Sequence, residues 1–150
     1  MRLARPGDAA AIRALVRAAY AKWVPVLGRE PRPMQADYDA AVMQHRFDLM
    51  QADGLLVALI ETATRPDHLW IENIAVSPER QGHGLGRLLL GHAEGLAREA
   101  GLAEVRLLTN GKMLANRRLY AGMGYAEDRE DPFGDGTVVY LSKRLDQPGG

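Results

Sequence analysis

The chain has 150 residues, of which 47% are hydrophobic and 25% charged, a composition typical of one globular domain. Its 19 basic residues balance its 19 acidic residues, which argues against a protein whose main task is to bind nucleic acid. Cysteine is absent, which excludes disulfides, zinc–thiolate sites and cysteine nucleophiles. The sequence shows no apolar signal run and no segment of membrane-spanning length, so we expect a cytoplasmic protein without membrane partners.

The first part of the chain is expected to form a short strand and two helices. Leu3–Arg5 predicts the strand, and Asp8 is a suitable N-cap for the first helix. The apolar residues of this helix recur at helical spacing: Ile12, Leu15, Val16, Ala19 and Trp23. Prolines and a glycine predict a loop over Val24–Pro33, and a second helix follows over about Gln35–His45.

The middle of the chain predicts three strands. Phe47–Met50 and Leu55–Glu61 flank a tight turn at Ala52–Gly54, which is typical of a hairpin. Leu69–Val76 is the third and longest of these strands.

The longest helix is expected over about Leu85–Ala100, with Gly101 as its C-terminal cap. A strand over Val105–Thr109 and a helix over about Met113–Met123 follow. Two closing strands are expected over Tyr125–Arg129 and Thr137–Lys143, around a loop at Pro132–Gly136.

This order of elements predicts a mixed α/β (α+β) fold, with a mostly antiparallel sheet of about six to seven strands and four helices. No repeat or interdomain linker interrupts the chain. We therefore expect a single domain over residues 1–145 and a flexible tail over residues 146–150.

A glycine-rich segment, Arg80-Gln81-Gly82-His83-Gly84-Leu85-Gly86, joins the third long strand to the longest helix. Glycine adopts positive φ without penalty and lets the backbone approach a ligand closely. The N–H groups of Gly82–Gly86 would converge at the helix N-terminus, an arrangement that suits a phosphate or pyrophosphate. Arg80 and Arg87 would add charge-assisted contacts. The alternative is a tight strand-to-helix turn without a ligand.

Two familiar phosphate loops do not fit this segment. A Walker A loop requires a lysine that is absent here. A dinucleotide-binding fold places its loop after the first strand and an acidic residue at the end of the next strand, whereas this loop lies mid-chain and the next strand ends at Asn110.

The segment Gln81–Gly86 resembles the Gln/Arg-x-x-Gly-x-Gly/Ala acetyl-CoA loop of the GCN5-related N-acetyltransferases (GNAT). Ile74-Ala75-Val76 is similar to the end of that family's splayed fourth strand. Asn116–Tyr125 resembles its later Asn-x-x-x-Tyr…Gly-Phe/Tyr segment, and the order of elements fits from residue 2 to about 145. The resemblance implies a GNAT-like fold that is splayed at the acetyl-CoA site.

The resemblance further implies acetyl-CoA as co-substrate. The backbone amides of Ile74 and Val76 would pair with the pantetheine arm, the loop amides would hold the pyrophosphate, and Asn116 would bind the arm. The histidines show no metal-ligand spacing, so no metal is expected. The predicted cofactor-binding residues are Ile74, Ala75, Val76, Arg80, Gln81, Gly82, His83, Gly84, Leu85, Gly86, Arg87 and Asn116.

Tyr120 is the general acid that the resemblance implies for the leaving thiolate. It lies four residues after Asn116, so both share one face of the predicted helix. A tyrosine is protonated at neutral pH and can donate to a developing thiolate. The alternative is a core aromatic residue whose hydroxyl is bonded elsewhere.

Glu72 is the second candidate catalytic residue. It interrupts an apolar strand and shares one strand face with Trp70, Ile74 and Val76. A buried or half-buried carboxylate would be costly there unless it is paired. Glu72 resembles the glutamate that serves polyamine-acetylating relatives as a base, usually through water; the alternative is an exposed or salt-bridged carboxylate. Asn73 stands where those relatives have aspartate, so the acceptor stays open.

The connection between the first two helices lines the acceptor site in related acetyltransferases. Trp23 and Arg32, together with Arg29, would suit an acceptor that carries a ring or a carboxylate. The alternative is an ordinary helix connection with solvated charges.

The leading hypothesis is an N-acetyltransferase that transfers acetyl directly from acetyl-CoA to a primary amine of a small molecule or peptide. A regulatory acyl-CoA-binding module with little or no catalysis is an alternative, and a generic nucleotide-binding module is a third. A homodimer is what the resembling family often forms.

Overall fold

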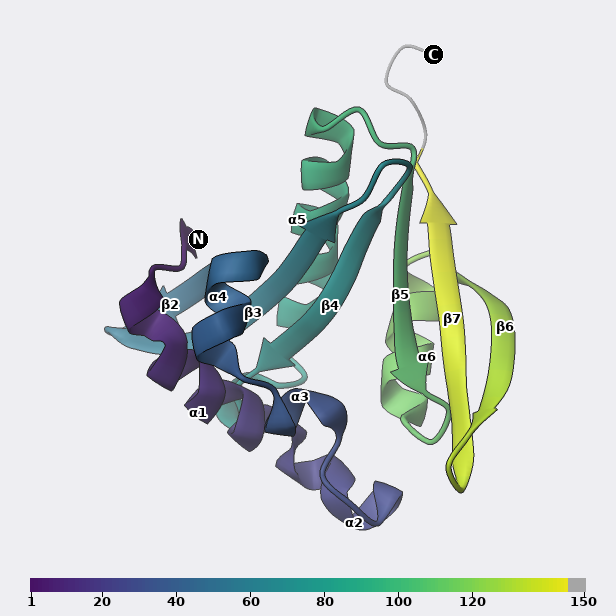
Figure 1. Ribbon diagram of the computed structural model, residues 1–150, viewed down its shortest axis with the longest axis horizontal. Coiled ribbons are helices and arrows are strands. Elements are labelled where there is room, and N and C mark those ends of the chain that lie inside the picture. The colour runs from purple at the N-terminus through teal and green to yellow at the C-terminus, as the bar shows by residue number, and fades with distance from the viewer. Residues whose placement is uncertain (146–150) are drawn as a thin grey trace. The chain divides into compact units, whose positions relative to one another are not determined.

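A computed structural model of the chain describes residues 1–145; the expected tail over residues 146–150 lies outside the described residues. Seven strands form a mixed sheet in the order β1-β2-β3-β4-β5-β7-β6 (Figure 1). The strands are β1 (Arg2–Leu3), β2 (Arg46–Ala52), β3 (Leu55–Thr64), β4 (Leu69–Val76), β5 (Glu104–Asn110), β6 (Ala126–Phe133) and β7 (Gly136–Arg144).

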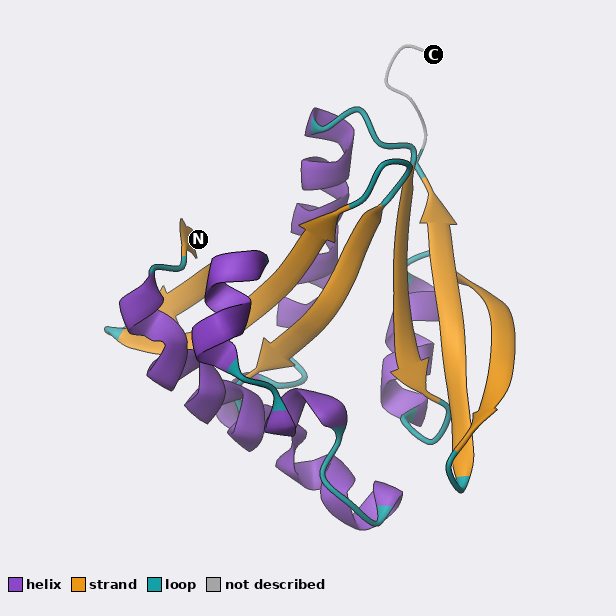
Figure 2. Ribbon diagram, viewed as in Figure 1, coloured by secondary structure: helices purple, strands orange, loops and turns teal. Residues whose placement is uncertain are grey.

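Four longer helices accompany the strands, and two four-residue helices and short 3-10 turns join them (Figure 2). The longer helices are α1 (Ala9–Tyr20), α4 (Tyr38–Gln44), α5 (Leu85–Glu99) and α6 (Leu114–Gly122). The short ones are α2 (Val24–Leu27), α3 (Arg32–Gln35), and the 3-10 turns η1 (Pro6–Asp8), η2 (Ala21–Trp23) and η3 (Pro78–Arg80). The predicted mixed α/β fold is confirmed.

Residues 1–145 divide into two compact units. Unit 1 comprises Met1–Thr62 and Asn73–Leu89, and unit 2 comprises Ala63–Glu72 and the chain from Leu90 onward. The strands β3 and β4 and the helix α5 each contribute residues to both units.

The core of unit 1 forms where α1 and α4 meet β2 and β3. The aromatic rings of Tyr38 and Phe47 contact each other edge to face, with their centroids 6.2 Å apart. The apolar spacing of α1 explains its buried face, and the cluster consists of Ala9, Ile12, Leu15, Val16, Ala19, Tyr38, Phe47, Leu49, Leu59 and Ala75.

The β2–β3 hairpin is confirmed, with strands longer than expected. Asp53 and Gly54 adopt φ angles of 54° and 76°, as the two central residues of a type I′ turn require. The turn therefore fixes an antiparallel register in which Ala52 lies opposite Leu55.

The predicted loop over Val24–Pro33 is wrong, because the structure places α2 and the start of α3 there. Pro25 and Pro33 lie in the first turns of these helices, where a missing N–H breaks no intrahelical bond. Gly28 ends α2 with a φ of 76°, a conformation that favours glycine.

In unit 2, Gly101 caps α5 as predicted. Its φ is 75°, and the N–H of Leu102 donates to the carbonyl of Ala97 at 2.8 Å. The chain then enters β5, which pairs with β7 in an antiparallel register.

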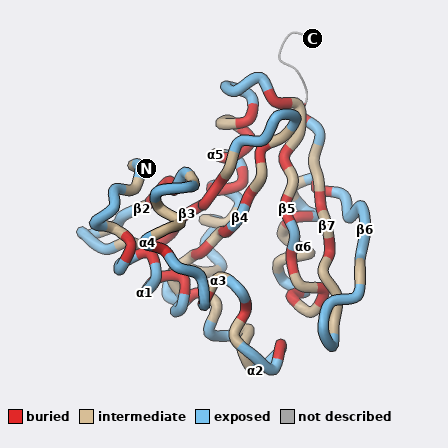
Figure 3. Tube along the Cα trace, viewed as in Figure 1, coloured by how far each residue is buried: buried red, intermediate tan, exposed pale blue. Residues whose placement is uncertain are grey.

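The loop expected over Pro132–Gly136 is shorter in the structure, because β6 continues to Phe133. The strand β6 lies at the edge of the sheet, and most of its residues are exposed (Figure 3). An edge strand tolerates Pro132, since a missing N–H on the outer side breaks no ladder bond.

Asp8 precedes α1 as predicted, but its side chain does not cap that helix. Its carboxylate instead accepts hydrogen bonds from the Arg2 guanidinium at 2.8 and 2.9 Å and from the Arg5 N–H at 2.7 Å. The short turn η1 carries Asp8 into helical φ and ψ angles, which differ from the extended angles usual for a side-chain cap. The Arg2 bonds lower the pKa of Asp8 from 3.8 to about 2.

None of the helices within residues 1–145 combines the length and the apolar character that a membrane crossing requires.

Replacing Asp8 with asparagine should lower the free energy of unfolding by about 1 kcal/mol at neutral pH, because a charge-assisted bond is lost. The depressed pKa means that this contribution is present above pH 3.8 and is lost as the pH falls through about 2. Urea unfolding of both proteins between pH 2 and 7 measures the difference. A difference that stays constant down to pH 2 would contradict this assignment.

Candidate functional site

The glycine loop lies in unit 1, between β4 and α5. Gly82 and Gly84 have φ angles of 81° and 82° and use the left-handed region, whereas Gly86, the third glycine of the predicted loop, lies inside α5 without a positive φ. The carbonyl of Gly84 accepts the N–H of Leu88 at 3.1 Å, which makes Gly84 the N-cap residue immediately before α5. The first N–H groups of α5 therefore follow two left-handed glycines, the backbone arrangement that suits an anion.

Gln81 braces this loop. Its side-chain amide donates to the carbonyl of Val76 at 2.9 Å, and its side-chain oxygen accepts from the ammonium of Lys22 at 2.8 Å. Gln81 thus connects the end of β4 to the segment after α1. Sequence reasoning missed Lys22, because it lies 59 residues from Gln81.

The strand β4 alternates strictly between a buried and a more exposed face. Leu69, Ile71, Asn73 and Ala75 are buried, whereas Glu72 is exposed and Trp70, Ile74 and Val76 are half-buried. The predicted sharing of one face by Glu72, Ile74 and Val76 is confirmed.

Side chains engage the carbonyls of Ile74 and Val76. The Tyr20 hydroxyl lies 3.0 Å from the Ile74 carbonyl and 2.8 Å from the Asn73 side-chain oxygen. The parallel pairs that join β4 to β5 are Leu69–Val105 and Trp70–Arg106, so Ile74 and Val76 lie beyond the last pair.

Glu72 is the last residue of β4 that belongs to unit 2. Its carboxylate is exposed, as in the alternative interpretation, and accepts the indole N–H of Trp70 at 2.7 Å. The residue is therefore an accessible carboxylate with one oxygen already hydrogen-bonded.

The helix α6 carries Asn116 and Tyr120, also in unit 2, and their spacing places both on one face of the helix. The Asn116 amide lies 3.5 Å from the sulfur of Met113. Tyr120 is 6% exposed, and its ring meets that of Tyr125 edge to face, with centroids 6.2 Å apart. Burial raises the pKa of Tyr120 to about 12, so its hydroxyl is protonated at neutral pH.

An ion pair between the buried Glu94 and the half-buried Lys143 lies beside the Tyr125 ring. Glu94 accepts the Tyr125 hydroxyl at 3.1 Å through one oxygen and the Lys143 ammonium at 3.0 Å through the other. Burial and the negative charge of Glu94 raise the pKa of Tyr125. Sequence reasoning missed Glu94: an acidic residue on the buried side of an amphipathic helix is a signal that could have found it, whereas nothing along the chain identifies Lys143 as its partner.

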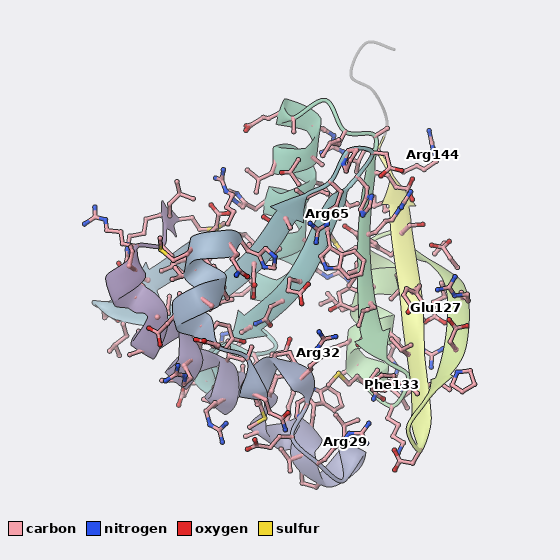
Figure 4. The ribbon with its side chains drawn as sticks, viewed as in Figure 1. Arg29, Arg32, Arg65, Glu127, Phe133 and Arg144 are labelled. Atoms are coloured by element: carbon pink, nitrogen blue, oxygen red, sulfur yellow. The ribbon has the colours of Figure 1, made fainter. Side chains whose placement is uncertain are left out.

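The residues expected at the acceptor site lie in unit 1. Trp23, in η2, is half-buried, and the Lys22 ammonium lies 5.3 Å from its ring centroid. Arg32 is exposed at the first residue of α3, shortly after the exposed Arg29 (Figure 4).

Unit 1 thus gathers most of the predicted residues, and unit 2 holds Glu72, Asn116 and Tyr120. The predicted residues of unit 1 are Trp23, Arg32, Ile74, Ala75, Val76, Arg80, Gln81, Gly82, His83, Gly84, Leu85, Gly86 and Arg87. Within residues 1–145, no three or more His, Cys, Asp or Glu side chains gather in a way that could hold a metal ion.

Several solved structures share this fold. The PaiA N-acetyltransferase from Thermoplasma acidophilum, in complex with coenzyme A, is 17% identical, with a TM-score of 0.78 over 97% of this chain and 100% of that chain. The yncA protein from Salmonella typhimurium, with its cofactor acetyl-CoA, is 21% identical, with a TM-score of 0.71 over 97% and 93%. The ribosomal-protein-S18-alanine N-acetyltransferase from Escherichia coli is 20% identical, with a TM-score of 0.73 over 97% and 94%.

A comparison with curated proteins found no match. The sequence does match a protein-family model, that of the acetyltransferase (GNAT) family, over residues 11–125. That match includes the whole of β4, the glycine loop, α5 and α6. Because it extends over most of the chain, the protein belongs to the acetyltransferase (GNAT) family.

Proposed function

We propose that this protein is an acetyl-CoA-dependent N-acetyltransferase that transfers acetyl directly to a primary amine of a small molecule or peptide. The observation that carries the proposal is the pair of left-handed glycines, Gly82 and Gly84, directly before α5 in a chain of the acetyltransferase family. We assign the catalytic domain to residues 1–145.

The loop would bind the pyrophosphate of acetyl-CoA. The N–H groups of Gly82–Gly86 and the positive end of α5 favour a diphosphate, and His83 and Arg87 lie exposed on the same segment. Arg80, half-buried at the end of η3, adds a positive charge. The coenzyme A in PaiA and the acetyl-CoA in yncA support this choice of ligand.

The end of β4 would hold the pantetheine arm and the thioester. The N–H of Ser77 donates to the carbonyl of Val57 in β3, so the N–H groups of Ile74 and Val76 point to the opposite edge of β4 under strand alternation. Tyr20 and Gln81 satisfy the carbonyls of Ile74 and Val76. The two N–H groups are then the donors left for the arm and for the oxyanion, and Asn116 contributes a further bond to the arm.

In the proposed reaction, the nitrogen of the acceptor attacks the thioester carbon, so a C–N bond forms and the C–S bond breaks. Glu72, directly or through water, takes the proton that the ammonium releases. Tyr120 gives its proton to the departing sulfur, a role that suits a hydroxyl held in its protonated form. Trp23 and Arg32 would contact the acceptor.

Acetyl-CoA and coenzyme A should each raise the melting temperature by about 5 to 10 °C at a hundredfold excess over Kd, because both bind only the folded protein. A thermal-shift panel that includes ATP and NAD measures this effect. Equal stabilisation by ATP or NAD would favour a nucleotide-binding module. Stabilisation by acetyl-CoA without thiol release from any amine in a library would favour the acyl-CoA-binding module.

Replacing Gly84 with alanine should weaken acetyl-CoA binding about tenfold. An added Cβ meets no atom within 4 Å, so the penalty arises from the φ of +82° rather than from a clash. Gly91→Ala is the matched control, because it adds a methyl group to α5 with equally open space and no positive φ. This control should stabilise the fold by about 0.5 to 1 kcal/mol and leave binding unchanged. Calorimetric titration of both variants tests the difference, and equal affinities would contradict the role of the loop.

Replacing Tyr120 with phenylalanine should lower kcat about a hundredfold, because the leaving thiolate loses its acid, while the Kd for acetyl-CoA stays unchanged. Steady-state thiol release measures kcat. Tyr125→Phe is the control: it removes a hydroxyl bonded to Glu94, so it should lower the melting temperature and leave kcat within about twofold. A Tyr120→Phe enzyme that keeps its full rate would remove Tyr120 from the mechanism.

A further inference from the structure

Trp70 and Glu72 form one hydrogen-bonded pair on the more exposed face of β4. The indole N–H donates to one carboxylate oxygen, Oε2, over 2.7 Å. Strand alternation puts the two side chains on the same face, two residues apart. Indole is a donor only and does not titrate at ordinary pH, so it contacts Glu72 without exchanging a proton with it.

Trp70 is held more firmly than Glu72. Its backbone belongs to the last residue pair that joins β4 to β5, opposite Arg106, whereas Glu72 lies two residues beyond that pair. The Trp70 ring also meets the His68 ring edge to face, with centroids 6.4 Å apart. His68 is itself hydrogen-bonded to Asp67 at 2.7 Å. The indole N–H therefore projects from an anchored side chain.

Glu72 lacks such anchoring except through the indole. An exposed glutamate samples several rotamers, and fixing one conformation costs entropy. The free energy of a hydrogen bond from a neutral donor to a carboxylate is about as large as the entropic cost of holding the Glu72 side chain in one rotamer. The bond occupies Oε2, so Oε1 is the carboxylate oxygen that remains available to accept a proton.

We propose that Trp70 is a positioning residue for the transfer reaction: its indole N–H holds Oε2 of Glu72 so that Oε1 takes the proton from the acceptor amine, directly or through one water. The inference rests on the proposed N-acetyltransferase function. It adds that the orientation of the base is set from within β4, by the residue two positions earlier on the same face.

A double-mutant cycle tests this role. Trp70→Phe keeps an aromatic ring beside His68 and removes the N–H, and it should lower kcat about tenfold with both KM values within about twofold. Glu72→Gln should lower kcat about a hundredfold. In the Glu72→Gln background, Trp70→Phe should cause no further loss, because the oxygen that it orients no longer accepts a proton.

The strand β6 offers a matched control. Arg129 donates to Asp131 over 2.7 Å, also two residues apart on one strand, and it lies in an exposed edge strand without a proposed catalytic role. Arg129→Gln removes this bond and should leave kcat unchanged. Thermal unfolding of every variant shows that the rates refer to folded protein.

Two results would overturn the inference and leave the proposed reaction intact: an unchanged kcat in Trp70→Phe, and a loss of kcat from Trp70→Phe that is equal with glutamate and with glutamine at position 72. An unchanged kcat in Glu72→Gln would remove Glu72 from the reaction, and the positioning role of Trp70 with it, while acetyl transfer itself would stand. Failure of the wild-type protein to release thiol with any amine would overturn the proposed function itself, and the positioning role with it. The first outcomes are measured on the variants and the last on the wild-type protein, so failure of the inference can be told apart from failure of the proposed function.

Discussion

The two-residue alternation of β4 is the constraint on which the rest of the structure depends. One face of this strand is buried and contributes Ala75 to the core of unit 1, so that face cannot also carry chemistry. The other face presents Glu72, Ile74 and Val76. Because neighbouring strand residues point to opposite faces, a shift of one residue in register would exchange the two sets.

The register of β4 is held by polar contacts as well as by the core. Asn73, buried in unit 1, donates its side-chain amide to the Tyr38 hydroxyl at 3.1 Å and accepts from the Tyr20 hydroxyl. A buried amide that lacked these partners would cost about 1 to 3 kcal/mol, so the two tyrosines and the strand stabilise one arrangement. Tyr20 also bonds the Ile74 carbonyl, which brings the same network to the strand residue proposed to hold the thioester.

Unit 2 accommodates a buried carboxylate, Glu94, beside Tyr125. Glu94 is 5% exposed, and a buried unpaired charge there would be strongly destabilising. Lys143 neutralises Glu94 and the Tyr125 hydroxyl bonds its second oxygen. The Tyr120 ring contacts the Tyr125 ring, and the raised pKa of Tyr120 arises from burial.

The sequence by itself determined the elements that have a strong local signal: the bounds of β4, the helix α5 with its Gly101 cap, the hairpin turn and the glycine loop. Periodicity and turn chemistry act over a few residues, so they are legible along the chain. No such period marks the four-residue helices α2 and α3 or the continuation of β6 through Pro132. These elements depended on their surroundings in the folded protein. Only the tertiary structure decided the partners: Tyr20 for the Ile74 carbonyl, Lys22 for Gln81 and Lys143 for Glu94, which are 54, 59 and 49 residues apart. Spacing along a chain cannot specify these bonds, because they form only after distant elements have packed together.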